Sequence, residues 1–130
     1  MKTGVPSDDE RYGFLPHTQV RAGDELVTIT RQDAEAMRQA LLAASRNHPD
    51  REYLLPLLEH RTAFISSDGV VHVGVFVLTT RDSGLFLEYL PRPRGAGRSD
   101  TFGWSAHVER DGGRWKVVEL HHTHIRWLVE

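Results

Sequence analysis

The second half of the chain alternates apolar stretches, rich in β-branched and aromatic residues, with short turns. The turns are Ser67-Asp68-Gly69, Asp82-Ser83-Gly84 and Asp111-Gly112-Gly113, with a longer, basic and glycine-rich loop at 91–100. Short turns join antiparallel neighbours, because parallel strands need a long crossover connection. The pattern therefore predicts an antiparallel meander. Its expected strands are 62–66, 70–79, 85–90, 102–110 and 115–127.

A helical pattern precedes these strands. The apolar residues Ala34, Met37, Leu41 and Ala44 recur at the 3.6-residue spacing of an amphipathic helix. Thr30 is a favourable N-cap for this helix, and Asp33, three residues later, approximates a capping box. Asp50 is expected to cap a second, shorter helix, which Pro56 either opens or kinks. Helices followed by an antiparallel sheet predict the α+β fold class.

The composition of the chain argues against several classes of protein. The 130 residues suit one domain, and the chain contains no cysteine for a disulfide or a zinc-thiolate site. A formal net charge of −2 gives no basic footprint for nucleic acid. No uncharged apolar run approaches the roughly 20 residues needed to cross a bilayer. The start also lacks the apolar region of a secretory signal, so a cytoplasmic protein with no nucleic-acid or membrane partner is expected.

Glycine and proline punctuate the first residues, which show no hydrophobic periodicity. Residues 1–23 are therefore expected to form a loosely ordered N-terminal arm, and residues 24–130 a single α+β domain. Leu26 to Ile29 reads as a possible short strand at the start of that domain.

Alternation of side chains indicates which strand faces are covered. In the strand 102–110, the apolar face carries Phe102, Trp104, Ala106 and Val108. The stretch 70–79 is apolar on both faces, so it needs cover on both. Helices would cover one face and a second subunit the other, which predicts a homodimer.

Two stretches resemble the SnoaL-like and kinase-II-association-domain branch of the nuclear transport factor 2-like superfamily. The first is DAEAMRQALLAASRNHPDREYLLPLLEHRTAFISSDG, similar to the family's opening helix, half-helix and first strand. The second is ERDGGRWKVVELHHTHI, similar to its closing hairpin with the pattern W-x-[IV]-V-x-x-H-x-[ST]. In this sequence those positions are Trp115, Val117, Val118, His121 and Thr123.

The resemblance implies N-terminal helices packed on a curved antiparallel sheet, the cystatin-like or nuclear transport factor 2-like cone, with a pocket between them. The chain departs from the family after Gly69, where the extra pocket-lining helix and small hairpin of many relatives are absent or shortened. No position matches the catalytic Asp of the steroid-isomerase-type relatives. No catalytic residue is therefore carried over from the family.

The last strand contains the candidate catalytic pair. With strict alternation, Glu119, His121 and Thr123 share a face with Trp115 and Val117. A carboxylate and an imidazole in an apolar cleft suit acid–base chemistry, which makes Glu119 and His121 the candidate catalytic residues. A hydrogen-bonded structural pair is the alternative.

Further candidates come from the aromatic and imidazole side chains. Trp104 would stack on a planar ligand or serve as core, and His107, Thr123 and His72 are candidate ligand-binding residues. His122 and His124 share one strand face and would begin a metal site only if neighbouring strands added ligands, for which His107, Glu109 and His72 are the candidates. Half-exposed strand histidines are the alternative, and no metal or cofactor is assigned.

Two functions from different classes remain open. The first is a non-catalytic binding or accessory protein that holds a small molecule or a protein partner in a sheet–helix pocket or on the open sheet face. The second is a SnoaL-like isomerase, cyclase or dehydratase that uses His121 and Glu119 as acid and base.

Overall fold

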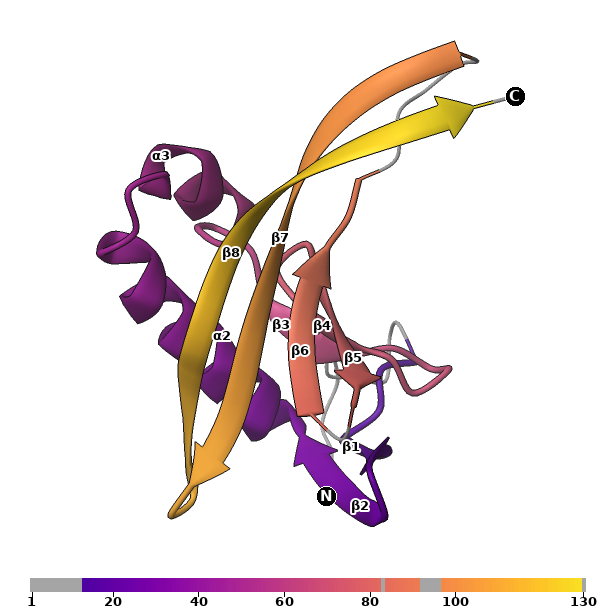
Figure 1. The fold of residues 1–130 in the computed structure, drawn as a ribbon. Coiled ribbons are helices and arrows are strands. Elements are labelled where there is room, and N and C mark those ends of the chain that lie inside the picture. The colour runs from indigo at the N-terminus through magenta and orange to yellow at the C-terminus, as the bar shows by residue number, and fades with distance from the viewer. Residues whose placement is uncertain (1–12, 83, 92–96, 130) are drawn as a thin grey trace, which may run out of the picture.

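A computed structural model describes residues 13–82, 84–91 and 97–129, without the side chains of 97–99 and 127–129 (Figure 1). The prediction of an α+β fold with an antiparallel sheet is confirmed. The helical elements are α2 (Arg31–Arg46), α3 (Arg51–Leu54) and the 3-10 turn η1 (Leu55–Leu57). The strands are β1 (His17–Ala22), β2 (Glu25–Thr30), β3 (Ala63–Ile65), β4 (Val71–Val73), β5 (Phe76–Arg81), β6 (Gly84–Tyr89), β7 (Gly97–Asp111) and β8 (Arg114–Val129).

The main sheet has six strands in the order β3-β4-β5-β6-β7-β8, and every neighbouring pair is antiparallel. This is the meander that the short turns predict. β7 and β8 are much longer than the other strands, and β6 pairs with only one part of β7. The remainder of β7 and β8 projects from the body as a two-stranded ribbon (Figure 1).

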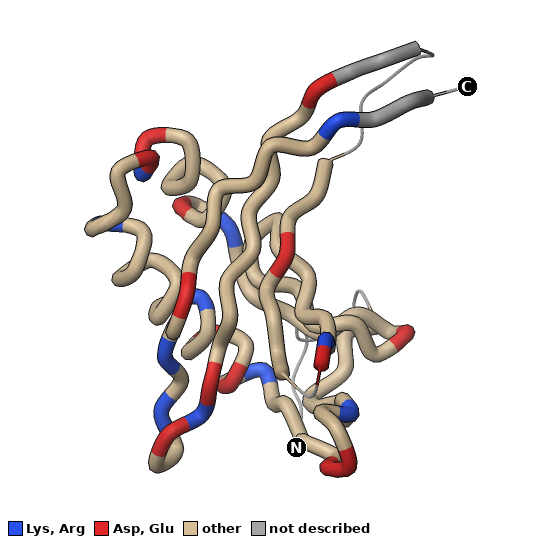
Figure 2. Tube along the Cα trace, viewed as in Figure 1, with Lys and Arg blue, Asp and Glu red and all other residues tan. Residues whose placement is uncertain are grey.

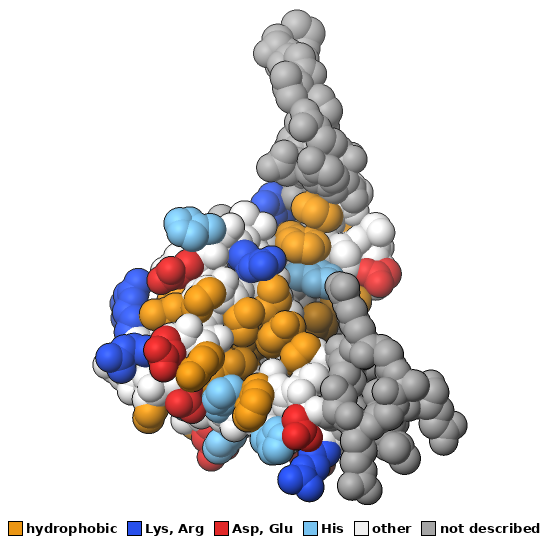
Figure 3. All heavy atoms as spheres, turned by 90° about the horizontal axis from the view of Figure 1, so that it is seen from above, with side chains coloured by type: hydrophobic (Ala, Val, Ile, Leu, Met, Phe, Trp, Pro, Cys, Tyr) orange, Lys and Arg blue, Asp and Glu red, His pale blue; other side chains and the backbone are white. Residues whose placement is uncertain are grey.

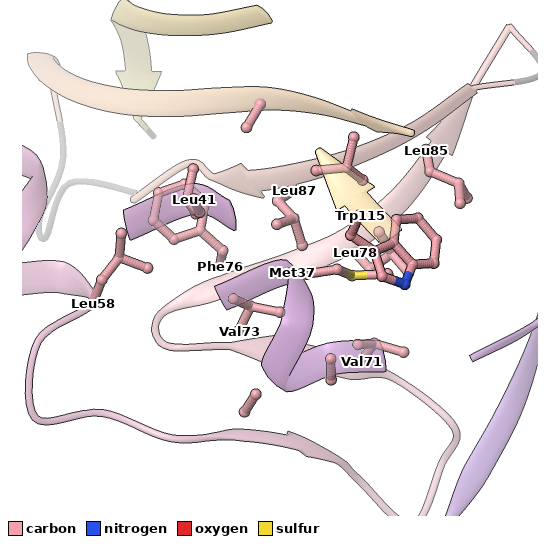
Figure 4. Packing of buried hydrophobic residues seen from close by; sticks show 14 of the residues in the cluster. Met37, Leu41, Leu58, Val71, Val73, Phe76, Leu78, Leu85, Leu87 and Trp115 are labelled. Atoms are coloured by element: carbon pink, nitrogen blue, oxygen red, sulfur yellow. The ribbon is translucent and has the colours of Figure 1, made fainter. Parts of the chain in front are cut away.

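Helix α2 lies against one face of this sheet. It contacts both β3 and β8, the two edge strands, so the sheet curves around the helix. The buried core between them includes Met37 and Leu41 of the predicted helical stripe, with Phe76, Leu87 and Trp115 from the strands (Figure 4). Burial of these side chains is the main term that stabilises the fold.

The start of α2 is fixed by a capped end, formed by Thr30, Asp33, Arg110 and Trp115. Thr30 is the N-cap, and its hydroxyl accepts a hydrogen bond from the Asp33 backbone N–H at 3.1 Å. The Asp33 carboxylate in turn accepts from the Thr30 backbone N–H at 2.8 Å, which completes the predicted capping box. Asp33 also accepts from the Trp115 indole N–H at 3.0 Å, so the helix start is tied to β8.

The N-terminal arm and the position of the helices need correction. β1 occupies most of the second half of the predicted arm and pairs with β2 along its whole length. The Leu15 backbone N–H also donates to the Ile65 carbonyl at 2.8 Å, which ties the segment to β3. The helices therefore follow a β-hairpin and do not open the fold. Residues 1–12 of the predicted arm lie outside the described residues.

The predicted strand 70–79 is two strands. A two-residue turn at Gly74 and Val75 separates β4 from β5, and Gly74 has a φ of 62°, which favours glycine. The turn shifts the alternation by one residue, so Val73 and Phe76 point to the same covered face. The other face carries His72, Val77 and Thr79, all of them half-buried. A homodimer stays a prediction, and the doubly apolar strand no longer supports it.

A β-bulge changes the phase of β8. The register passes from His107 opposite Glu119 to Val108 opposite Val117, so Val118 has no partner in β7. Trp115 and Val117 face the helix, but beyond the bulge Leu120 and His122 do so. The prediction that Glu119, His121 and Thr123 share the face of Trp115 is therefore wrong.

The second helix is short because Pro56 limits it. α3 ends after four residues, and the chain continues as η1 with Pro56 near its start. Asp50 precedes α3 but makes no side-chain capping hydrogen bond, contrary to the prediction. In the part of the chain that the structure describes, no helix is long and apolar enough to cross a membrane.

Candidate functional site

A hollow of about 400 Å³ opens between the α3–η1 segment and the helix-facing side of the sheet. We call it the cleft. Its walls are aromatic and apolar apart from one imidazole. The lining residues are Tyr53, Leu57, Tyr89, Phe102, Trp104 and His122. Five elements supply this set: the consecutive α3 and η1, and the strands β6, β7 and β8 from the second half of the chain.

Trp104 is the buried wall of the cleft, with only 2% of its surface exposed. It lies opposite His122 in the β7–β8 register, and the two rings stack with centroids 4.2 Å apart and planes 8° from parallel. The His48 ring makes a T-shaped contact with the indole, with ring centroids 5.1 Å apart. The indole therefore holds the His122 ring in one orientation.

Asp50 fixes the same imidazole from the helical side. Its carboxylate Oδ2 lies 3.0 Å from His122 Nδ1, although the two residues are 72 positions apart. The Asp50 backbone N–H donates to His48 Nδ1 at 3.0 Å. The turn before α3 thus places the Asp50 carboxylate against His122, the one imidazole that lines the cleft. Because the Asp50 side chain caps no helix, its carboxylate is free to hold His122.

Two exposed rings form the rim of the cleft. Tyr53 is 62% exposed and Phe102 58% exposed, and their ring centroids lie 6.1 Å and 5.4 Å from that of His122. Figure 3 views this end of the molecule and shows hydrophobic side chains gathered in one region, with charged side chains around it. β7 carries no Lys, Arg, Asp or Glu between Asp100 and Glu109, and its residues in the wall, Phe102 and Trp104, are uncharged (Figure 2).

The predicted catalytic pair does not line the cleft. His121 and Glu119 project from the opposite face of β8, with side chains 66% and 62% exposed. His121 Nε2 lies 3.4 Å from Glu119 Oε2, so the two groups do contact each other. Their contact is that of a solvated surface pair, whose energetic contribution is small.

Of the predicted ligand-binding residues, the structure places only Trp104 in the cleft. His72 stacks on Phe64, and His107 stacks on Phe86, both on the other face of the sheet. Thr123 lies opposite Gly103 on that face as well.

The suggested metal ligands are also divided between the two faces. His122 points toward the cleft, and His107 and His72 point away from it. Across the described residues, no three His, Cys, Asp or Glu side chains are grouped so that they could hold a metal ion. The hypothesis of a metal site at His122 and His124 therefore has no third ligand among the described residues.

A second hollow, of about 420 Å³, lies beside the β1–β2 hairpin and includes His107 in its wall. Its other walls include Arg110 and Trp115, which already have structural partners. Arg110 donates to the Thr28 carbonyl at 3.1 Å and pairs with Asp33 at 3.3 Å. Because these groups hold the capped end together, we take the aromatic cleft as the candidate site.

Sequence reasoning missed most of the cleft. Asp50 was expected to cap a helix, and His122 was considered only as a metal ligand or a half-exposed strand residue. One signal for the bulge exists: the apolar positions of the last strand change from Trp115 and Val117 to Val118 and Leu120. That change of parity indicates an extra residue and moves His122 to the face of Trp115.

Comparison with known proteins adds no relative: no protein-family model, no curated protein and no solved structure matches the chain.

Proposed function

We propose that this protein binds a small molecule in the cleft between α3–η1 and the sheet. The supporting observation is the hollow of about 400 Å³ whose lining is aromatic and apolar with one oriented imidazole. Small-molecule sites are typically concave, mostly apolar and of about 300–1,000 Å³, with a few polar groups that fix the ligand. The cleft has each of these properties.

The exposed rings on the rim strengthen this proposal. Tyr53 and Phe102 each leave more than half of their surface in water, although large aromatic side chains normally gain from burial. A ligand that covers both rings would recover that gain. A protein partner would need a much larger surface than one hollow, since stable protein–protein interfaces bury about 1,200–2,000 Å² in total.

A neutral solvatochromic dye, Nile red, tests the proposal. Its fluorescence should rise on entering the wild-type cleft, with one site per chain. Phe102→Ala and Tyr53→Ala should each weaken binding by about 3- to 10-fold, the usual worth of one aromatic contact. Because both side chains are largely exposed, neither change should greatly lower stability.

Phe86→Ala is the matched control. Phe86 is also an aromatic strand residue, but it stacks on His107 on the opposite face of the sheet, with ring centroids 4.7 Å apart. Its removal should leave dye affinity unchanged. Equal weakening by Phe86→Ala and Phe102→Ala would mean that the dye does not report on the cleft, and the proposal would fail.

The enzyme alternative is also a proposal, and the Asp50–His122 contact favours it. A carboxylate that orients an imidazole beside an apolar hollow is suited to proton transfer. If the protein is an isomerase, cyclase or dehydratase, the acid–base pair suggested by this geometry is His122 with Asp50, in place of His121 with Glu119. Turnover of a retained ligand, followed by mass spectrometry, should then disappear in His122→Gln and persist in His121→Asn.

We further propose that the fold is the nuclear transport factor 2-like or cystatin-like cone. A long helix against a six-stranded antiparallel sheet that curves around it supports the proposal, as does the position of the cleft. The hairpin β1–β2 before the helix departs from the expected order of elements. An experimental structure superposed on members of that superfamily tests the assignment, and a sheet order different from theirs would contradict it.

A further inference from the structure

The tautomer of His122 determines what the cleft can recognise. Asp50 Oδ2 lies 3.0 Å from Nδ1, and an ionised carboxylate can only accept a hydrogen bond. Nδ1 must therefore carry the proton of this contact. In a neutral imidazole the other nitrogen, Nε2, then has a free lone pair and is an acceptor.

The remaining walls argue against a ligand of negative charge. Among the described residues that line the cleft there is no Lys or Arg. The nearby carboxylate of Asp50 would repel an anion, because like charges disfavour each other at short distance. The polar group that a ligand presents to His122 should therefore be a neutral donor.

The arrangement of the rings favours a flat ligand. His122 lies face to face with Trp104 at 4.2 Å, and the exposed rings of Tyr53 and Phe102 flank it on the open side. Aromatic rings prefer offset-stacked or edge-to-face partners. A planar ring system satisfies those preferences and leaves its edge free to reach His122.

From these observations we infer that the cleft takes a planar ring system whose hydroxyl or N–H group donates a hydrogen bond to Nε2 of His122. The ligand class is thus that of phenols, enols and ring N–H compounds. This inference rests on the proposed function, since it names the ligand of the same cleft. Asp50 acts in it as a positioning residue that fixes the tautomer.

Three probes of one ring size test the inference. 2-Naphthol offers a hydroxyl donor, 2-methoxynaphthalene keeps the oxygen without the donor, and 2-naphthoate is an anion. Calorimetry at about pH 7.5, where an unperturbed imidazole is mainly neutral, compares their affinities. We expect 2-naphthol to bind wild type about 3- to 10-fold more tightly than 2-methoxynaphthalene, the usual worth of one hydrogen bond.

The variant His122→Phe separates the hydrogen bond from the stacking. It keeps an aromatic ring against Trp104 but removes the acceptor, so the two neutral probes should bind it equally. Equal affinities in wild type, a preference that survives in His122→Phe, or tighter binding of 2-naphthoate would each overturn the ligand class while leaving the cleft as a binding site. Failure of all three probes to bind wild type would overturn the proposed function as well.

A second measurement begins with the wild-type protein, so its first result does not depend on the folding of a variant. The ¹⁵N spectrum of the wild-type imidazole should show a protonated Nδ1 and an unprotonated Nε2 for His122. In Asp50→Ala this preference should be lost, and with it part of the selectivity for 2-naphthol. A wild-type ring protonated on Nε2 alone would contradict the inference.

Discussion

Two carboxylates make similar contacts at the two ends of α2, with different consequences. At the capped end, Asp33 accepts from the Trp115 indole N–H at 3.0 Å, and at the cleft, Asp50 lies 3.0 Å from His122 Nδ1. In both places a carboxylate near a helix start holds a ring of β8. Asp33 also completes the capping box and pairs with Arg110. Asp50 makes no capping hydrogen bond, and the ring that it holds, His122, lines a hollow.

The comparison shows that the surroundings decide what such a contact does. The Asp33 carboxylate is committed to several partners, and one of them is the indole of Trp115 in the hydrophobic core, so its contribution is to stability (Figure 4). Among the described residues, the Asp50 carboxylate has one side-chain partner, His122, and that partner lines an open hollow. Removal of each carboxylate should therefore affect different properties of the protein.

The largest expected effect is a loss of stability on removing Trp115, the aromatic ring of the capped end. Trp115→Ala should lower the free energy of unfolding by about 3–5 kcal/mol, the usual cost of deleting a buried large aromatic side chain. Urea melts measure the loss, with the exposed neighbour Lys116→Ala as control, expected to change stability by less than about 0.5 kcal/mol. A loss below about 1 kcal/mol for Trp115→Ala would contradict the claim that the capped end stabilises the fold.

A smaller loss is expected from the carboxylate itself. Asp33→Ala should cost about 2 kcal/mol, because it removes the N-terminal capping box and leaves the indole N–H of Trp115 without its acceptor. Urea melts measure this loss. Calorimetry should show no change in the affinity of the cleft for 2-naphthol. A variant as stable as wild type would contradict the comparison.

Low pH should remove the stability that the ionised Asp33 carboxylate contributes. Burial by itself would raise the pKa of Asp33, but hydrogen bonds from Thr30 and Trp115, with the charge of Arg110, outweigh it and lower the pKa. A carboxylate with a lowered pKa in the folded protein stabilises it above the ordinary Asp pKa, and this contribution is lost as pH falls through the lowered value. The stability difference between wild type and Asp33→Asn should therefore shrink in acid. A difference that grows would contradict this assignment.

At the cleft, loss of the carboxylate should affect binding more than stability. Asp50→Ala should lower the free energy of unfolding by less than about 1 kcal/mol, since no cap is lost. It should nevertheless reduce the preference for 2-naphthol over 2-methoxynaphthalene. If Asp50→Ala proved as destabilising as Asp33→Ala, both contacts would be structural and the comparison would fail.

The smallest effect is expected at His121. Its side chain is largely exposed on the opposite face of β8, so His121→Asn should change stability by less than about 0.5 kcal/mol. Binding of 2-naphthol should also be unchanged. A marked loss of affinity would mean that His121 lies in the binding site and that the assignment of the two faces of β8 is wrong.

Local patterns predicted the elements well. The capping box of Thr30 and Asp33 depends on residues three positions apart, and the helical stripe on residues within two turns. The turns that separate the strands are equally local. These features could be predicted because the interactions that specify them lie within a short stretch of chain.

The errors in the facing of the strands came from single residues that change the phase of a strand. One turn, at Gly74, divides a predicted strand, and one bulge, at Val118, reverses the faces of the last strand. Each inserts an irregularity into a period of two, so every later side chain is assigned to the wrong face. The change of parity from Val117 to Leu120 is the signal that would have placed His122 correctly.

The contact between Asp50 and His122 was not predictable from pattern. The two residues lie 72 positions apart, and the contact depends on how α3 sits over β8. Trp104 was recognised because its strand alternates regularly, but its position beside a hollow depends on packing between distant elements. The sequence predicts several residues of the site, but their arrangement around the cleft depends on tertiary packing.

The most direct test of the cleft is an NMR titration of the wild-type protein with 2-naphthol. Signals of Tyr53, Phe102 and His122, which line the cleft, should shift together and saturate at one ligand per chain. Signals of Phe86 and His107, which stack on the opposite face of the sheet, should stay in place. Shifts concentrated at Phe86 and His107, or no shift at the three cleft residues, would contradict the account.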